Sequence, residues 1–182
     1  MKPTSELLHR IGANPHAYLG LHDKTIRQWR PGAEEIWVEL SDHKIKMEKV
    51  HPEGLFEVKL PLTIDPLDYK IWHSDGTLAY DPYVFLPTLG EVDLYLFAKG
   101  VHYELYKVLG ARFCRHQEVE WVKFAVWAPS ARSVALVADF NLWDGRVTPL
   151  RCLGQSGVWE IFIPGLQEGT RYKFEITTPT GE

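Results

Sequence analysis

The sequence predicts a mainly β protein made of two β-sandwiches in tandem. One observation is local: short runs that alternate apolar and less apolar residues are separated by turns containing Pro, Gly, Asp and Asn. Such runs are typical of strands that bury one face. The other observation concerns the whole chain, because the runs recur in the same order in the two halves of its 182 residues. A long internal repeat indicates a duplicated structural unit.

Three pairs of segments carry the repeat. In the first pair, IRQWRPGAEEIWVEL and KFAVWAPSARSVALV, both segments contain Trp-x-Pro-small-Ala and continue into a β-rich run. The later pairs stay in register, because the offset from Gly54 to Gly157 equals that from Tyr69 to Tyr172. The aligned segments are residues 26–40 with 123–137, 53–61 with 156–164, and 68–76 with 171–181. Several short strands per unit predict an immunoglobulin-like sandwich.

The two predicted sandwiches are joined by a short helical linker. In this linker, acidic residues come early, Lys99 comes late and Gly100 follows as a stop, which predicts a short helix; a second turn or two would end at Gly110. Thr4 or Ser5 can cap a helical lead-in to the first unit. We assign residues 1–86 to the first sandwich with its lead-in, residues 87–111 to the linker and residues 112–182 to the second sandwich.

The second unit lacks a counterpart to one part of the first. Residues 77–85 look like a closing strand of the first sandwich, whereas the second unit reaches Glu182 before such a strand. A sandwich without its edge strand exposes unpaired backbone. We therefore expect the second sandwich to be truncated at its last strand, and the chain to be the front of a longer protein.

Composition excludes several classes of function. The net charge of −4 and the absence of a basic run disfavour nucleic acid and anionic membranes as partners. No signal peptide or membrane-spanning stretch is evident. Cys114 and Cys152 lack metal-ligand spacing and disulfide density, so a reduced, cytoplasmic protein is expected. The scattered histidines predict no metal site, and nothing in the sequence calls for a cofactor.

The tryptophans divide into two groups. Trp29, Trp127 and Trp159 lie in predicted strands and are expected in the cores, while Trp37 and Trp72 are expected in a core or at contacts between domains. Trp143 stands instead in VADFNLWDGRVTPL, among residues that form turns cheaply. A surface loop gives a large indole little burial. Trp143 therefore either covers part of this chain or binds something outside it.

Four stretches together resemble the amino-terminal part of bacterial glycogen branching enzymes. They are RPGAEEIWV, YDPYVFLPTLGEVDLYLFAKGVHYELYKVLGA, VKFAVWAPSARSVALVADFNLWDGRVTPLR and SGVWEIFIPGLQEGTRYKFEI. DPYVFLPTLGEVDLYLF is the most specific of them. The broader FAVWAPSA and DFNLWD are similar to the glycogen-binding-type carbohydrate module that branching enzymes share with debranching enzymes and with regulatory subunits of energy-sensing kinases.

The resemblance implies an enzyme whose chemistry lies elsewhere. Members of the family cut an α-1,4-glucan and reattach the piece through an α-1,6 bond, using two carboxylates of an α-amylase-type barrel. Such a barrel needs roughly 250 residues and does not fit within this chain. The resemblance assigns no catalytic position to Asp81, Asp139 or Asp144, which are expected at turns and strand ends. We expect the chain to be inactive alone and to contact the barrel within the full enzyme.

The resemblance also implies a site for α-glucan or glycogen at Trp143, Lys173 and Asn141. Trp143 matches a sugar-stacking tryptophan, Lys173 matches a lysine that contacts sugar hydroxyls, and Asn141 fixes the turn through its amide. A second stacking tryptophan of these modules has no match here. The alternative for Trp143 is docking on the barrel, and for Lys173 it is a solvated strand lysine. The first unit has the equivalent pair Tyr69 and Lys70, but its loop ELSDHKIKM has no tryptophan where the second unit has Trp143. The first unit is therefore not expected to bind sugar in the same manner.

Two other functions remain open at this point. The chain could be a free-standing glycogen-binding or regulatory module without a catalytic partner, although the predicted missing strand and the linker weigh against that. It could also be a structural pair of immunoglobulin-like domains that binds protein, although the DFNLWD loop and the cysteine usage weigh against that.

Overall fold

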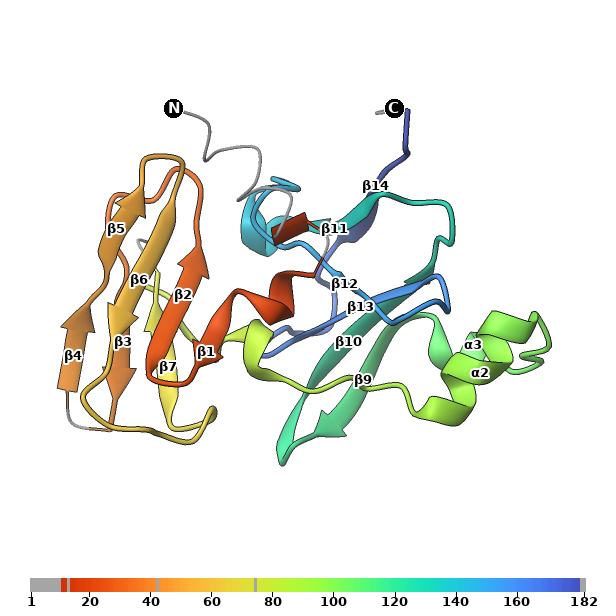
Figure 1. The fold of residues 1–182 in the computed structure, drawn as a ribbon, viewed down its shortest axis with the longest axis horizontal. Coiled ribbons are helices and arrows are strands. Elements are labelled where there is room, and N and C mark those ends of the chain that lie inside the picture. The colour runs from red at the N-terminus through yellow and green to blue at the C-terminus, as the bar shows by residue number, and fades with distance from the viewer. Residues whose placement is uncertain (1–10, 13, 42, 74, 181–182) are drawn as a thin grey trace. The chain divides into compact units, whose positions relative to one another are not determined.

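A computed structural model describes residues 11–12, 14–41, 43–73 and 75–180, which form two compact units. The first unit is His16–Val84. The second unit runs from Phe85 onward and also takes in Pro15 and the described residues before it. Both units are built mainly from antiparallel strands (Figure 1), which confirms the predicted mainly β fold. The lead-in helix predicted from Thr4 or Ser5 lies largely outside the described residues.

The first unit is a sandwich of two four-stranded antiparallel sheets. One sheet has the order β1-β2-β6-β5 and the other β4-β3-β7-β8. The strands are β1 (Gly20–His22), β2 (Thr25–Trp29), β3 (Trp37–Leu40), β4 (His43–Lys46), β5 (Glu48–His51), β6 (Leu55–Lys59), β7 (Tyr69–Trp72) and β8 (Leu78–Ala79). Short 3-10 helices, η1 (Pro15–Ala17) and η2 (Pro82–Val84), lie at its two ends in the sequence.

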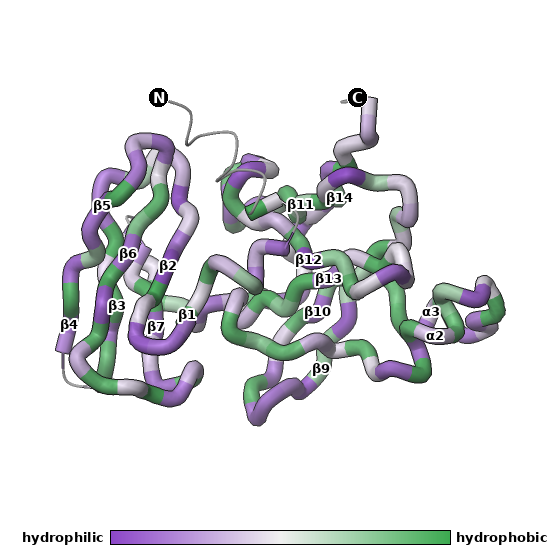
Figure 2. Tube along the Cα trace, viewed as in Figure 1, coloured by the Kyte–Doolittle hydropathy of each residue, from purple (hydrophilic) through white to green (hydrophobic). Residues whose placement is uncertain are grey.

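The core of the first unit follows from alternation along its strands. Figure 2 shows hydrophobic and hydrophilic residues alternating along these strands, so each sheet has one apolar face. The two apolar faces meet in a cluster of buried side chains: Ile26, Ile36, Val38, Met47, Phe56, Leu60, Tyr69 and Ile71. Burial of this apolar area is the main force that holds the sheets together.

From Phe85 to residue 180, the described part of the second unit contains two α-helices and six strands. Its helices are α2 (Glu91–Lys99) and α3 (Leu105–Val108). Its strands are β9 (Gly110–His116), β10 (Val119–Trp127), β11 (Ser133–Ala138), β12 (Arg151–Cys152), β13 (Val158–Ile163) and β14 (Tyr172–Thr177), with η3 (Asp139–Asn141) after β11. One sheet has the order β12-β13-β10-β9, and β11 pairs with β14 in the other.

The repeat seen in the sequence is also present in the topology. The order β1-β2-β6-β5 in the first unit matches β9-β10-β13-β12 in the second, and the pair β3-β7 matches β11-β14. In the first unit β8 pairs with the far side of β7. Among residues 85–180, no strand takes the corresponding place beside β14. The two units are thus copies of one sandwich design.

Each copy contains the same glycine contact with the Trp-x-Pro turn. The amide of Arg30 donates to the carbonyl of Gly54 at 2.8 Å, and the amide of Ala128 donates to that of Gly157 at 2.8 Å. Gly54 has φ +113°, and a Cβ there would lie 2.4 Å from the carbonyl oxygen of Arg30. Gly157 has φ +74° and equally little room beside Pro129. Only glycine allows both this backbone conformation and this close approach.

The helical segment packs on the second unit. Gly100 has a left-handed conformation and ends α2, and its amide donates to the carbonyl of Phe97 at 3.0 Å, as the predicted stop requires. Phe97 of α2 and Val108 of α3 are buried in a cluster with Leu89, Ala125, Leu153 and Val158. The segment following the first unit therefore contributes to the core of the second.

A buried ion pair anchors the start of the second unit. Arg151 and Glu160 lie on the paired strands β12 and β13, with Nη2 and Oε1 2.8 Å apart. Arg151 also donates to the carbonyl of Phe85 at 2.8 Å, and the amide of Thr88 donates to Glu160 at 3.0 Å. Glu160 is fully buried. The pair thereby fixes the chain entering this unit.

One of the three predicted core tryptophans is not in a core. Trp29 and Trp159 are buried, as predicted, whereas Trp127 is 51% exposed. Trp127 is the last residue of β10, and its Nε1 donates to the carbonyl of Ser156 at 3.2 Å. The indole rests on the turn at Gly157 instead of entering the sandwich.

Within the described part of the chain, no helix is long and apolar enough to cross a membrane.

Candidate functional site

The loop after β11 presents Trp143 in a defined backbone conformation. Asp139, Phe140 and Asn141 form η3, and the next two residues, Leu142 and Trp143, both have positive φ, 56° and 61°. Non-glycine residues adopt this left-handed region at a cost, so surrounding bonds must hold them there. The amide of Trp143 donates to the carbonyl of Ala138 at 3.1 Å, which closes the turn.

Asn141 supplies most of those bonds. Its side chain is buried, and Oδ1 accepts from the amide of Ala138 at 2.9 Å. Its Nδ2 donates to the carbonyl of Leu136 at 2.7 Å and to Oγ1 of Thr148 at 3.0 Å. The amide thus ties the loop to the strand before it and to the segment after it, and its hydrogen-bonding groups point into the protein.

The indole of Trp143 is partly exposed and is held through its ring nitrogen. The residue is 41% exposed, and Nε1 donates to Oδ1 of Asp139 at 3.1 Å. Asp139 is itself held by Arg171, whose Nε lies 3.2 Å from Oδ2. The hydrogen bond from the Arg171 side chain lowers the pKa of Asp139, so its carboxylate stays ionised and keeps accepting from the indole.

Lys173 extends from the strand that the loop touches. It is exposed on β14, and it lies between Arg171 and Glu175 on one face of the chain, because side chains two apart on a strand share a face. Both neighbours contact the loop. Arg171 binds Asp139, and the carboxylate of Glu175 occupies the space beside Gly145. The structure therefore brings Lys173 to the same surface as the loop of Trp143.

Two exposed apolar residues of the loop were not singled out from the sequence. Leu142 is 88% exposed and Phe140 is 38% exposed. Together with Trp143 they form an apolar cluster on a short polar loop, which is unusual for a surface turn. The available signal was the presence of three apolar residues in FNLW, but the sequence does not reveal the left-handed turn at Leu142 and Trp143.

The carboxylates near the loop are engaged with arginines. Asp144 accepts from Arg146, with Oδ2 and Nη2 2.6 Å apart, and this hydrogen bond lowers the pKa of Asp144. Asp139 is held ionised by Arg171. A general acid needs a proton at its working pH, and neither carboxylate is set up to keep one. These two ionised carboxylates are therefore suited to holding the loop in place and not to donating a proton.

Asp81, from the DPYVF motif, is a buried carboxylate with structural partners. Its Oδ2 accepts from the hydroxyl of Tyr69 at 2.6 Å and from the side-chain amide of Gln28, and its Oδ1 accepts from the amide of Tyr83 at 2.9 Å. Burial raises the pKa of Asp81, and these hydrogen bonds oppose that effect. Asp81 lies between β8 and η2, where a turn or strand-end residue was expected, and it also ties this segment to the core of the first unit.

Comparison with known proteins gives matches to both units. Residues 2–83 match the family model of the N-terminal domain of alpha-1,4-glucan branching enzyme GlgB. Residues 108–182 match the model of carbohydrate-binding module 48, the isoamylase N-terminal domain. The module match covers β9 to β14 and the loop of Trp143.

Curated relatives match nearly the whole chain. The 1,4-alpha-glucan branching enzyme GlgB of Protochlamydia amoebophila is 55% identical over 97% of this chain and 25% of its own length. That of Chlamydia abortus is 46% identical over 93% of this chain and 24% of its own length. The chain thus spans about a quarter of the curated relatives it matches. A solved apo pullulanase from Klebsiella pneumoniae aligns over 97% of this chain and 22% of its own at 19% identity, with a TM-score of 0.34, too low to add to these findings.

The fold and the matches first define a class, a tandem of immunoglobulin-like β-sandwiches whose second member is a carbohydrate-binding module of type 48. The match of the first unit then narrows this class. The chain corresponds to the amino-terminal region of the curated 1,4-alpha-glucan branching enzymes GlgB, which confirms the resemblance found in the sequence.

Proposed function

We propose that this chain is the non-catalytic amino-terminal part of a glycogen branching enzyme and that it binds and positions α-glucan. The enzyme as a whole would form α-1,6 branches in α-1,4-glucan during glycogen biosynthesis. The observation that carries the binding role is the indole of Trp143, which the loop holds open to solvent at a fixed orientation. The names of the relatives support the choice of polymer.

The proposed contact is stacking of the indole on a glucose ring. The C–H-rich face of glucose is apolar, and an indole offers a flat apolar surface of similar size, so contact removes apolar area from water. Trp143 is already ordered by Asp139 and by the turn that Asn141 fixes. Binding therefore loses little side-chain entropy. In this proposal Asn141 acts through the loop, because its amide is used internally.

Lys173 is proposed to act at the edge of the same site. It is exposed on β14, between two residues that contact the loop. A lysine ammonium donates up to three hydrogen bonds and can reach the hydroxyls of a stacked sugar. Such contacts add orientation more than affinity, since each replaces a bond to water.

A second candidate role for the loop is contact with an α-amylase-type barrel in the full enzyme. The exposed side chains of Leu142 and Phe140 favour it, because their apolar area extends beyond what one sugar ring would cover.

We also propose that the protein is located in the cytoplasm. Cys114 and Cys152 are both free thiols, as expected in a reducing compartment.

Co-sedimentation with glycogen tests the proposed function. The purified chain should pellet with glycogen and be released by soluble maltoheptaose, but not by the β-linked glucan cellohexaose. Incubation with amylose, followed by enzymatic debranching and chain-length analysis, should show no new branch points. A chain that stays in the supernatant at high glycogen concentration would refute glucan binding, and new α-1,6 linkages would refute the non-catalytic assignment.

A further inference from the structure

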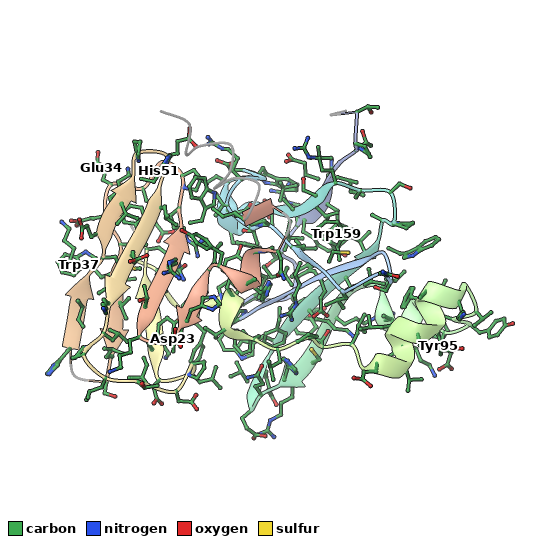
Figure 3. All side chains as sticks on the ribbon, viewed as in Figure 1. Asp23, Glu34, Trp37, His51, Tyr95 and Trp159 are labelled. Carbon is green, nitrogen blue, oxygen red and sulfur yellow. The ribbon has the colours of Figure 1, made fainter. Side chains whose placement is uncertain are left out.

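The first unit carries a pair of tryptophans on the outer face of its β4-β3-β7-β8 sheet. Trp37 on β3 lies opposite Trp72 on β7, while the adjacent pair, Val38 and Ile71, is fully buried in the core. Because side chains alternate along a strand, the two indoles must stand on the opposite, outward face. Both are half-buried. Figure 3 shows the side chain of Trp37 outside the ribbon of the sandwich.

A hollow of about 610 Å³ adjoins this pair. Both indoles line it, together with Glu34, Glu35, Lys44 and His73. Its volume falls within the range of small-molecule sites, which is roughly 300–1,000 Å³. The combination of aromatic walls with a few polar groups is also typical of such sites.

The position of this pair corresponds to the candidate site in the second unit. Since β3 and β7 match β11 and β14, Trp72 stands where the second unit has Glu175, and Lys70 stands where it has Lys173. In the second unit this face is approached by the loop of Trp143. In the first unit no such loop is needed to supply an indole. Strand β4 pairs with β3 beside this face, and the indoles belong to the strands β3 and β7 of the sheet. Both units therefore present tryptophan at the same face of the duplicated fold.

The charges around the hollow favour a neutral ligand with many hydroxyls. Glu35 and Lys46 form an exposed ion pair with Oε2 and Nζ 2.6 Å apart, and Trp72 Nε1 donates to Glu39. Carboxylates and ammonium groups are mixed on this face, with Lys44 and Lys46 beside Glu35 and Glu39, so no cluster of one sign would select a phosphate or a cation. Carboxylates and ammonium groups on a mixed surface can, however, accept from and donate to sugar hydroxyls.

Lys44 lies over both indoles, and Lys46 lies over that of Trp37. The Nζ of Lys44 lies 4.6 Å from the ring centroid of Trp72 and 5.3 Å from that of Trp37. Lys44 is exposed, and an exposed cation–π contact is weak enough for a ligand to displace. Once displaced to the rim, the ammonium remains within reach of the ligand's hydroxyls.

We propose that the face formed by Trp37, Trp72 and Lys44 is a second α-glucan-binding site. This inference rests on the proposed function for the choice of an α-linked glucan. Trp37 and Trp72 occupy paired positions on adjacent strands, so one glucan segment stacks on both indoles. Two sites on one chain bind a polymer with many ends more strongly than either site alone, because the second contact is intramolecular.

Indole NMR tests this site separately from Trp143. The full chain, labelled with ¹⁵N, is titrated with maltoheptaose, and the Nε1–H signals of its seven tryptophans are assigned by single Trp→Phe variants. Trp37 and Trp72 should shift in a saturable manner, whereas the buried Trp29 should not shift. Trp72→Ala should weaken the titration seen at Trp37 at least tenfold while leaving that of Trp143 unchanged.

The outcomes separate this inference from the proposed function. Shifts at Trp143 with none at Trp37 and Trp72 would overturn the second site and leave the proposed function intact. Shifts at Trp37 and Trp72 with none at Trp143 would support the second site alone. Equal shifts with cellohexaose would overturn the α-linked choice of ligand. The titration of the wild-type chain gives these results even if Trp72→Ala fails to fold.

Discussion

Replacing Trp143 with alanine should weaken glucan binding about tenfold without unfolding the protein. The residue is 41% exposed. A tryptophan side chain presents up to about 250 Å², so roughly 100 Å² is open. A sugar covers about half of that and loses a similar area of its own. At about 25 cal/mol per Å², the two surfaces contribute roughly 2.5 kcal/mol before binding costs, and about 1.4 kcal/mol corresponds to a tenfold change.

Native gel electrophoresis with glycogen in the matrix measures this effect. The apparent dissociation constant comes from the retardation at several glycogen concentrations. Trp127→Ala is the matched control, because Trp127 is 51% exposed in the same unit but rests on the turn at Gly157. It should leave retardation unchanged. If Trp143→Ala migrates like the wild type at every glycogen concentration, or if both variants lose retardation equally, stacking on Trp143 is wrong.

Three further predictions concern stability. Glu160→Leu should cost roughly 3–5 kcal/mol in urea unfolding, because it leaves Arg151 buried without its carboxylate, and adding Arg151→Met should recover most of that loss. Gly54→Ala should cost about 2–4 kcal/mol in the same assay through its backbone clash, whereas Gly76→Ala, with open space around it, should cost about 1 kcal/mol. His73 has a pKa lowered to about 3 by burial and by the nearby Arg30, so the fold favours its neutral form. The first unit should lose stability as pH falls from about 6.5 toward 3, by up to about 1.4 kcal/mol per unit, and His73→Gln should flatten that slope.

Each of these predictions has a result that contradicts it. A double variant no more stable than Glu160→Leu would show that the loss does not come from the unpaired charge. Equal costs at Gly54 and Gly76 would mean that the close approach to Arg30 is relaxed at little cost. A pH dependence identical in wild type and His73→Gln would show that this imidazole titrates alike in the folded and unfolded states.

Much of the fold could be predicted because its signals are local. Alternating apolar residues, Gly and Pro turns and a repeat in register predicted both sandwiches, and Gly100 predicted the end of α2. Side-chain placement at strand ends could not be predicted in the same way. Trp127 shares a face of β10 with Lys123 and Ala125, opposite Val122 and Phe124, and at the end of the strand its indole rests on the turn at Gly157.

The candidate site was only partly predictable for a related reason. Trp143 was conspicuous because an indole is rare in a polar turn, and the turn-forming role of Asn141 followed from its residue type. The pairing of Trp37 with Trp72 depends on strand register, which links residues far apart in sequence. The burial of Asp81 depends on Gln28 and Tyr69, whose positions only the assembled sheets define.

Saturation-transfer difference NMR of maltoheptaose with this chain tests the central claim most directly. Irradiation of aromatic protons should saturate the C–H protons on one face of the glucose rings, and Trp143→Ala should reduce that transfer markedly while Trp127→Ala leaves it unchanged. An absence of transfer to the sugar, or full transfer in Trp143→Ala, would contradict the account that this loop holds an indole ready for glucan.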